Sequence, residues 1–252
     1  PVSTPGTDEG ASGGGDGDEV QEEDELPAAE ASQFRAIAAR CNYLQPDRPD
    51  IQFAVKECCR LMSRPTARAW EMLKRVGRYL KGRPRLVWKF GWQSAMEVVE
   101  AHSDANWAAC KLSRKSSSGG TIAVGGHLIR AYSKTQSVVA KSSGESELYA
   151  AVKAATEALG IISLYSDFGV KSMKASVGMD ASAAIGIIQR QGLGKLRHVE
   201  VDVLWLQEQQ ARKLLPLVKV PGPRNPSDMG AKNIAVALVD QYLGQLNLEI
   251  VE

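Results

Sequence analysis

Residues 97–132 read EVVEAHSDANWAACKLSRKSSSGGTIAVGGHLIRAY, and their pattern is the clearest sign of a sheet in this chain. The pattern after Glu97 predicts a strand that runs into Asp104. Two further strands are expected at 120–124 and 128–132, joined by Gly125-Gly126, a dipeptide typical of tight hairpin turns. The stretch therefore predicts three consecutive strands, the last two of which form a hairpin.

The residues after the hairpin alternate between helical and extended patterns. A long helix is expected from about Glu145 to Asp167, with apolar residues at alternating steps of four and three. The other expected elements are a strand at 175–179 that ends at Asp180, a short helix at 183–190, a helix at 199–212, a strand at 215–220, a Pro-Gly-Pro loop and a C-terminal helix from about Pro226. This order predicts an α/β domain with a mixed five-stranded sheet and helices on both faces.

The segment upstream of the sheet, residues 34–90, has a helical pattern that four prolines interrupt, which predicts about three short helices. The third helix and its exit are rich in cations, and we predict nucleic-acid contacts there for Lys74, Arg75 and Arg78. Aromatic residues are interleaved with these cations, at positions 70, 79, 88 and 92. They could stack on bases, but aromatics at helical spacing more often belong to a core, and we favour the core.

The N-terminus differs in composition from the rest of the chain. Residues 1–32 are predicted to be a disordered acidic linker, because they offer almost no large apolar side chain to bury. Residues 1–30 hold ten of the 29 acids and no Lys or Arg, so the remainder carries 31 basic against 19 acidic side chains. A basic body suits a polyanionic partner, although a solubilising surface is the alternative. The start at Pro1 suggests a fragment of a longer chain.

Membrane insertion and zinc binding are not expected from the sequence. No apolar run approaches the roughly 20 residues that a membrane span needs, and the acidic N-terminus does not resemble a secretory signal. The four cysteines lack the paired spacing of a zinc site, and two of them are sequence neighbours. We therefore expect a reduced, intracellular location and no membrane contact.

Four acids occupy positions from which they could meet. Asp104 and Asp180 close two strands, and Glu147 and Asp228 lie near the starts of two helices. Clustered carboxylates repel one another unless cations lie between them, and oxygen ligands without Cys or His favour Mg²⁺ or Mn²⁺. Two such ions could activate water on one side of a phosphodiester and stabilise the leaving oxygen on the other. Spacing alone leaves open that the helix-start acids are ordinary caps.

Several sequence blocks resemble the C-terminal part of the Pol polyprotein of copia-type LTR retrotransposons. The blocks are 102–108 (HSDANWA), 114–119 (RKSSSG), 142–149 (SSGESELY), 180–184 (DASAA), 195–200 (KLRHVE) and 225–228 (NPSD). The resemblance implies a ribonuclease H-like domain over residues 93–252 that cuts the RNA strand of RNA–DNA hybrids with two Mg²⁺ ions, or with Mn²⁺. It places the catalytic, metal-binding acids at Asp104, Glu147, Asp180 and Asp228. It also favours Glu147 over Glu145, which is expected to be an exposed helix-start residue.

The same resemblance extends upstream to residues 33–92. Segments 47–55 and 73–82 resemble the thumb and connection at the end of a reverse transcriptase, but the polymerase's own Asp-Asp motif is absent, so no polymerase activity is expected. The implied partners are an RNA–DNA hybrid and the rest of the polyprotein, with its reverse transcriptase and integrase. The implied locations are the cytoplasm, within a virus-like particle, and the nucleus. Two positions depart from the family pattern, Ala181 after the third acid and Ala231 before Lys232.

Further contacts with nucleic acid are predicted in two loops. Arg114, Lys115 and Ser116 are placed to meet phosphates, with a solvated turn as the alternative. Lys195, Arg197 and His198 form a second group, although a histidine at a helix start is more often structural. His102 is expected to be packed rather than a metal ligand. Two competing functions are a catalytically inactive nucleic-acid-binding remnant and a DNA transposase or integrase, which would need a different set of acids.

Overall fold

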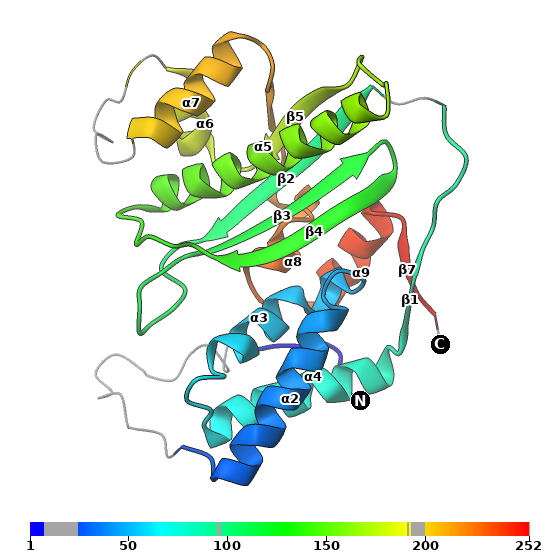
Figure 1. Cartoon of the computed structure of the whole chain (residues 1–252), viewed down its shortest axis with the longest axis vertical. Helices are drawn as coiled ribbons and strands as arrows, with labels where there is room; N and C mark the ends of the chain where they lie inside the picture. Colours follow the sequence, from blue (N-terminus) through cyan, green and yellow to red (C-terminus); the bar gives the residue numbers. More distant parts are fainter. Residues whose placement is uncertain (8–24, 95–96, 191, 193–199, 252) are drawn as a thin grey trace.

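The computed structural model describes residues 1–7, 25–94, 97–190, 192 and 200–251 (Figure 1). Its main helices are α2 (Ala28–Leu44), α3 (Gln52–Arg60), α4 (Ala67–Gly82), α5 (Ser143–Asp167), α6 (Ser182–Gln189), α7 (Glu200–Ala211), α8 (Asp228–Ala231) and α9 (Val236–Gln245). The strands are β1 (Arg85–Trp88), β2 (Val98–Asn106), β3 (Ser117–Val124), β4 (His127–Thr135), β5 (Lys174–Met179), β6 (Leu217–Lys219) and β7 (Leu248–Val251), with 3₁₀ turns η1 (Pro49–Ile51) and η3 (Gly222–Arg224).

The predicted mixed five-stranded sheet is confirmed, with the strand order β4-β3-β2-β5-β6. The first three strands are antiparallel, and Asp104 of β2 faces Gly119 of β3 in the register. Strand β2 is parallel to β5, and β5 is parallel to β6. Because β2 and β5 are parallel neighbours, they bring the chain out at the same edge of the sheet, where Asp104 and Asp180 lie.

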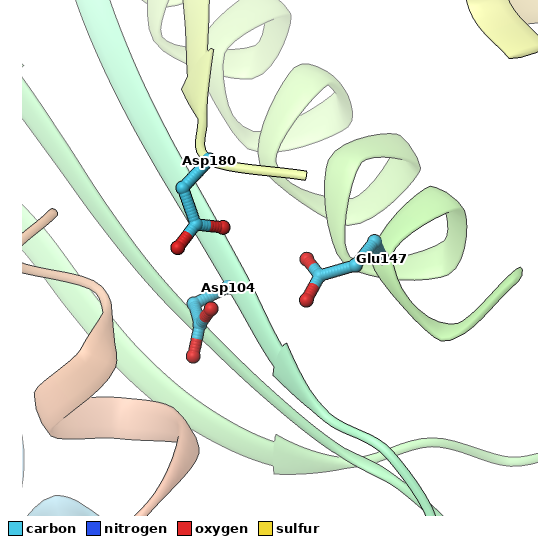
Figure 2. A group of neighbouring side chains, drawn as sticks. All are labelled: Asp104, Glu147 and Asp180. Carbon is cyan, nitrogen blue, oxygen red and sulfur yellow. The ribbon is translucent and has the colours of Figure 1, made fainter. Parts of the chain in front are cut away.

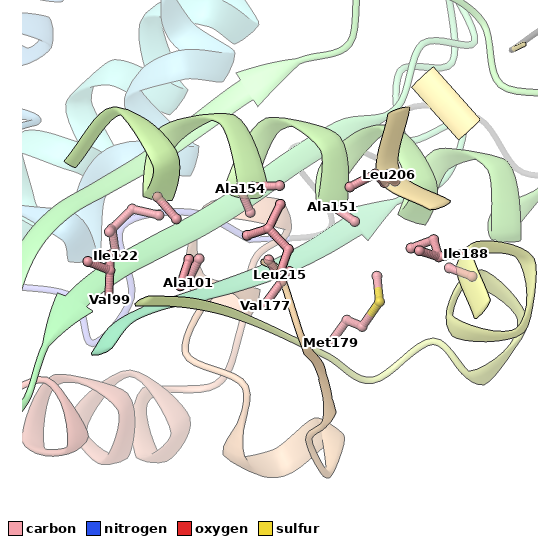
Figure 3. Packing of buried hydrophobic residues seen from close by; sticks show 14 of the residues in the cluster. Val99, Ala101, Ile122, Ala151, Ala154, Val177, Met179, Ile188, Leu206 and Leu215 are labelled. Carbon is pink, nitrogen blue, oxygen red and sulfur yellow. The ribbon is translucent and has the colours of Figure 1, made fainter. Parts of the chain in front are cut away.

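One face of the sheet is covered by α5, with α6 and α7 beyond it (Figures 1 and 3). Small residues of α5, such as Ala151 and Ala154, pack against Val99, Ala101 and Val177 in one buried cluster. Alanines let the helix approach the sheet closely, so α5 is held rigidly over the strand ends. By length and composition α5 is apolar enough to span a membrane, but its packing on the sheet marks it as the core helix of this fold.

The opposite face is covered by the short helix α8, so helices lie on both faces as predicted (Figure 1). Gly119 makes this close approach possible, because a Cβ there would lie 2.1 Å from the carbonyl oxygen of Ser227 and 2.6 Å from the backbone nitrogen of Ala231. Any side chain at position 119 would push α8 away from the sheet. Since α8 begins with Asp228, this packing fixes where the fourth acid lies.

The upstream helices α2, α3 and α4 form a bundle with a core of its own, which includes Phe34, Val55, Leu73 and Tyr79. The core assignment of the aromatics is confirmed for Tyr79, which is fully buried, and for Trp70, whose ring lies 6.0 Å from that of Phe34. Trp92, in contrast, is 99% exposed. Lys56 of α3 reaches the five-stranded sheet, where its Nζ donates a hydrogen bond of 2.5 Å to the Ser117 hydroxyl.

The segment after α4 and the C-terminal segment meet in a two-stranded ribbon that the sequence did not predict. Strand β1 pairs with β7, and Trp88 faces Leu248 in the register. The helix break predicted at Pro84 is confirmed, because α4 ends at Gly82, but the strand formed by the next residues was not predicted. The single C-terminal helix predicted from Pro226 is instead α8, α9 and β7.

The N-terminal tail also differs from the prediction at both of its ends. Helix α2 begins at Ala28 rather than after residue 32. Residues 1–7 lie against the bundle, where the Thr4 hydroxyl accepts a hydrogen bond of 3.0 Å from Arg75. Residues 8–24, which carry most of the predicted linker's acids, lie outside the described residues.

Candidate metal centre

Three of the four predicted acids come together at one edge of the sheet. Asp104, Glu147 and Asp180 each offer a carboxylate oxygen, and these oxygens lie within 4.8 Å of one another. Figure 2 shows the carboxylates of Asp104 and Asp180, from β2 and the end of β5, with that of Glu147 reaching toward them from α5. Asp104 and Glu147 are buried and Asp180 is half-buried. The geometry therefore satisfies the sequence-based expectation that the strand ends and the start of α5 converge.

The position of Glu147 follows from how α5 starts. Ser142 is the N-cap, and its hydroxyl accepts a hydrogen bond of 3.2 Å from the backbone nitrogen of Glu145. The helix therefore begins at Ser143, which places Glu147 in its second turn. Glu145 is not the exposed residue that was predicted. It is 1% exposed, and its carboxylate accepts a hydrogen bond from the backbone nitrogen of Lys141, so it helps to fix the helix start.

The fourth acid, Asp228, lies beside Asp104 rather than inside the group of three. A single lysine connects the two, because Lys232 Nζ lies 3.0 Å from Asp228 Oδ1 and 3.6 Å from Asp104 Oδ2. The loop before α8 is tied to β2, since the Asn225 amide donates a hydrogen bond of 2.9 Å to the backbone carbonyl of Ser103. Asn225 in turn accepts a hydrogen bond from the Ser227 hydroxyl. These contacts explain why Asp228 reaches the site from a distant part of the sequence.

The carboxylates are held in an environment that opposes their ionisation. Burial, and then the negative charge of Asp228, raises the pKa of Asp104 to about 7. Burial, and then Asp104 and Asp180, raises the pKa of Glu147 to about 8. For Lys232, burial opposes the charged form, but Asp104 and Asp228 outweigh it and raise its pKa. The negative charges of the site are therefore only partly neutralised by Lys232, and a further cation would stabilise them.

The donor set fits a hard divalent cation. Asp104 Oδ2 and Glu147 Oε2 are buried and have no hydrogen-bond partner within the described parts of the chain. A buried carboxylate oxygen without a partner is costly, and a cation is the natural partner for several such oxygens that face one another. All the converging ligands are oxygen atoms, which Mg²⁺ and Mn²⁺ prefer and which zinc sites seldom use alone. His102 is not a ligand in this arrangement, because its ring packs closely against Gly178.

The predicted nucleic-acid contacts have different surroundings. Arg114 is exposed and Lys115 half-buried, but Ser116 is fully buried and its hydroxyl accepts a hydrogen bond of 3.0 Å from the backbone nitrogen of Ala108. Ser116 therefore shapes the loop and does not face a ligand. Lys195, Arg197 and His198 lie outside the described residues.

The predicted contacts on α4 are already engaged within the protein. Lys74 Nζ pairs with Glu71 at 2.7 Å, and Arg78 lies 3.7 Å from the same carboxylate. Arg75 is half-buried beneath residues 1–7, so it is the least accessible of the three cations. The charge of this helix face is thus smaller than the count of cations suggested.

Sequence reasoning missed two groups that touch the acids. Lys232 follows the last residue of α8, and the sequence did not show that its side chain would turn back to Asp228 four residues earlier. Tyr242 carried no signal at all. Its hydroxyl lies 3.4 Å from Asp228 Oδ2 across a loop and a helix, and no local pattern reports such a contact.

No protein-family model matches the chain. It is 29% identical over 186 residues to the retrovirus-related Pol polyprotein from transposon TNT 1-94 of Nicotiana tabacum, covering 73% of this chain and 14% of that protein. It is 30% identical over 193 residues to the corresponding polyprotein from transposon RE2 of Arabidopsis thaliana, covering 75% and 13%. The chain thus spans about one seventh of these Pol relatives.

Two other similar proteins are not Pol polyproteins. The secreted RxLR effector protein 161 of Plasmopara viticola is 35% identical over 124 residues, which cover 49% of this chain and 87% of that protein. Among solved structures, the LC11 ribonuclease H1 isolated from compost by a metagenomic approach is 17% identical, with a TM-score of 0.42, and the match covers 54% of this chain and 94% of that one.

Proposed function

The chain belongs to the family of copia-type retrotransposon Pol polyproteins, and from that premise we propose that it is a ribonuclease H-type endonuclease. Its substrate is the RNA strand of an RNA–DNA hybrid, and its cofactor is a pair of Mg²⁺ ions, which Mn²⁺ can replace. The observation that carries the proposal is the convergence of carboxylate oxygens from Asp104, Glu147 and Asp180 within 4.8 Å. We assign Asp228 to the same site through its contact with Lys232.

Each acid has a role in the proposed reaction that its position supports. Asp104 and Glu147 offer buried oxygens without hydrogen-bond partners, which suit direct metal binding. Bound divalent ions would supply an activated water and neutralise the charge on the leaving oxygen. Asp180 approaches the site from the end of β5, and Asp228 from the start of α8. When no metal is present, the positive charge of Lys232 partly neutralises Asp104 and Asp228.

The partners of the proposed enzyme follow from the same family premise. The hybrid would be recognised by its backbone geometry and 2′-hydroxyls rather than by its bases. We propose Arg114 and Lys115 as phosphate contacts, together with Lys195, Arg197 and His198. Ser116 is not one of them, because it is fully buried. The reverse transcriptase and integrase portions of the polyprotein are proposed partners. Cleavage would take place in cytoplasmic particles or in the nucleus, with residues 93–252 as the nuclease domain.

Cleavage of a 5′-labelled RNA–DNA hybrid, with and without Mg²⁺, tests the proposal. The wild-type chain should cut the RNA strand only with Mg²⁺, and Asp104→Asn and Asp180→Asn should each lower the rate by about 100-fold or more. Asp167→Asn, at the exposed far end of α5, is the matched control and should leave the rate unchanged. Equal cleavage by wild type and the two site variants would refute the assignment. Salt-sensitive hybrid binding without any cleavage would instead support a non-catalytic, nucleic-acid-binding remnant.

A further inference from the structure

Tyr242 is a fully buried residue of α9 whose hydroxyl lies between Asp228 and the turn η3. The hydroxyl is 3.4 Å from Asp228 Oδ2 and 3.2 Å from the backbone carbonyl oxygen of Gly222. We propose that Tyr242 is a positioning residue for the acid site, and that the upstream helical segment sets its position through α9. The inference rests on the proposed function, because it concerns how that site holds divalent ions.

Through its contact with Gly222, Tyr242 is also connected to a second acid, Asp180. Gly222 begins η3, and a Cβ at this residue would lie 3.1 Å from Asp180 Oδ2, so the turn lies directly against the Asp180 carboxylate. A neighbouring residue of α9 holds the same turn, since the Gln241 amide donates a hydrogen bond of 2.6 Å to the carbonyl oxygen of Pro223. One face of α9 therefore touches both Asp228 and the turn that borders Asp180.

The hydroxyl has a specific task at this position. A buried tyrosine hydroxyl normally has a hydrogen-bond partner, and Tyr242 can donate to either the carboxylate or the carbonyl. A donor beside Asp228 favours one orientation of its carboxylate, and such partners of metal ligands commonly set metal affinity. Phenylalanine would keep the ring in its apolar cluster with Val239 and Leu243 but would remove this donor.

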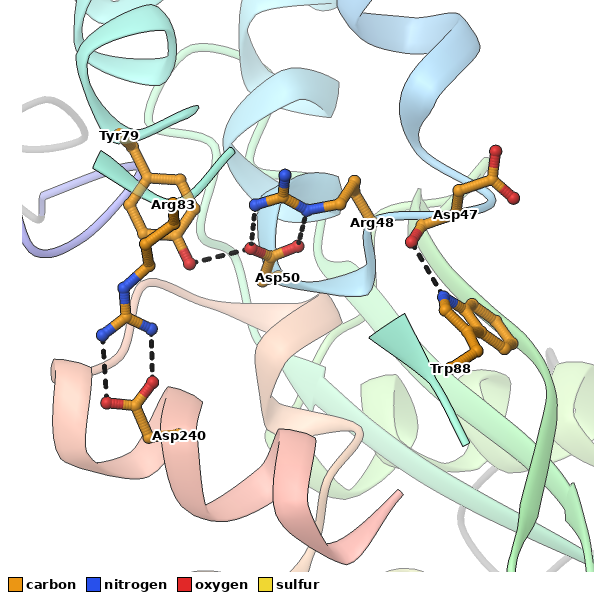
Figure 4. Close-up of polar contacts among 7 residues, drawn as sticks. All are labelled: Asp47, Arg48, Asp50, Tyr79, Arg83, Trp88 and Asp240. Atoms are coloured by element: carbon orange, nitrogen blue, oxygen red, sulfur yellow. Dashed lines mark hydrogen bonds and ion pairs between the residues drawn. The ribbon is translucent and has the colours of Figure 1, made fainter. Parts of the chain in front are cut away.

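The upstream segment determines where α9 lies. Arg83, directly after α4, forms a two-pronged ion pair with Asp240 of α9, and its second contact, from Nη2 to Oδ2, is 3.0 Å (Figure 4). Strand β1 pairs with β7, which follows α9, and the side chains of Leu86 and Trp88 pack against the cluster that contains Tyr242. Two independent contacts thus connect the upstream segment to the helix that carries Tyr242.

Mn²⁺ binding to the full chain, measured by calorimetry, tests the inference directly. Tyr242→Phe should weaken Mn²⁺ binding by about tenfold and lower kcat on the hybrid, with little change in KM. Tyr165→Phe is the control. It also removes a tyrosine hydroxyl and keeps the ring, but it lies in the last part of α5, away from α9 and from Arg83. It should leave the Mn²⁺ affinity unchanged.

Arg83→Met provides a second variant in case Tyr242→Phe does not fold. It alters no group at the acid site, yet it removes the ion pair that holds α9, so it should weaken Mn²⁺ binding in the same direction by a smaller factor. Unchanged Mn²⁺ affinity in a folded Tyr242→Phe protein would overturn the inference, as would unchanged affinity in Arg83→Met if that variant alone folds. A wild-type chain that binds Mn²⁺ but cuts no hybrid would refute the proposed function and leave this comparison valid. A wild-type chain that binds no Mn²⁺ would overturn both.

Discussion

Replacing Glu147 with glutamine should stabilise the protein when no divalent ion is bound, and the gain should grow with pH. Burial, together with Asp104 and Asp180, raises the pKa of Glu147 from 4.5 to about 8 in the folded protein. The unfolded chain releases this proton near pH 4.5, whereas the folded chain holds it until about pH 8. The contribution of Glu147 to stability is therefore fully present below the unfolded pKa and is lost as the pH rises through the folded one.

The size of the effect follows from the shift of the pKa. Each unit corresponds to about 1.4 kcal/mol, so the gain from Glu147→Gln should increase from about 1 kcal/mol near pH 5 to about 4 kcal/mol near pH 8. For a chain of this size, the larger value corresponds to an increase of about 10 °C in the melting temperature. Glutamine matches the shape of glutamate but cannot ionise, so packing should change little.

Urea unfolding in EDTA, followed by tryptophan fluorescence across this pH range, measures the gain. Glu100→Gln is the matched control, because Glu100 is an exposed glutamate on β2 outside the acid cluster, and we expect no gain that grows with pH. Saturating Mg²⁺ should favour the wild type instead, since ligand binding stabilises only the protein that retains all its metal ligands. Stability curves for wild type and Glu147→Gln that run parallel from low to high pH in EDTA would refute the reasoning.

Two further predictions concern the metal and the packing of α8. The Mg²⁺ affinity, measured by calorimetry, should increase as the pH rises through about 7 to 8, because Asp104 and Glu147 must lose their protons before they bind the ion. A Mg²⁺ affinity that does not change with pH would contradict this prediction. Gly119→Ala should destabilise the protein by about 2–3 kcal/mol in urea unfolding, since its Cβ would meet the backbone of Ser227 and Ala231. Gly77→Ala is the control. Gly77 is an exposed position of α4 where an added Cβ would meet nothing within 4 Å, so this substitution should stabilise the protein by about 0.5–1 kcal/mol. Equal stability of Gly119→Ala and wild type would contradict the close approach of α8.

Local patterns predicted those parts of the fold that local interactions specify. The helix predicted to end at Asp167 does so in the structure, because its apolar spacing and the Ser142 cap act within the helix itself. The hairpin turn falls at Gly125, whose φ of 61° lies in the left-handed region that glycine readily adopts. The same reasoning placed Asp104 and Asp180 together, because parallel neighbouring strands end at one edge whatever the side chains between them.

Local sequence patterns could not predict pairing between strands that lie far apart in the sequence. Residues 85–88 and 248–251 are each too short to stand out as strands, and each is extended because the other is its partner. The burial of Glu145 was missed for a related reason. An acid near a helix start is usually exposed, and only the contact with the Lys141 backbone shows that this one faces inward.

The contacts around α9 also affect where a domain boundary can be placed in the chain. The resemblance to Pol divides it after residue 92, yet β1 lies before that point and pairs with β7 at the other end. Lys56 donates to Ser117, and Gln52 donates a hydrogen bond of 3.0 Å to the carbonyl oxygen of Ala131, so α3 also holds the sheet. Removing residues 1–92 would expose the apolar side of the cluster around Tyr242 and leave β7 without a partner. A division at that point keeps the four acids together in residues 93–252 but removes contacts that hold α9, and we infer that the nuclease domain needs the upstream segment to position Asp228.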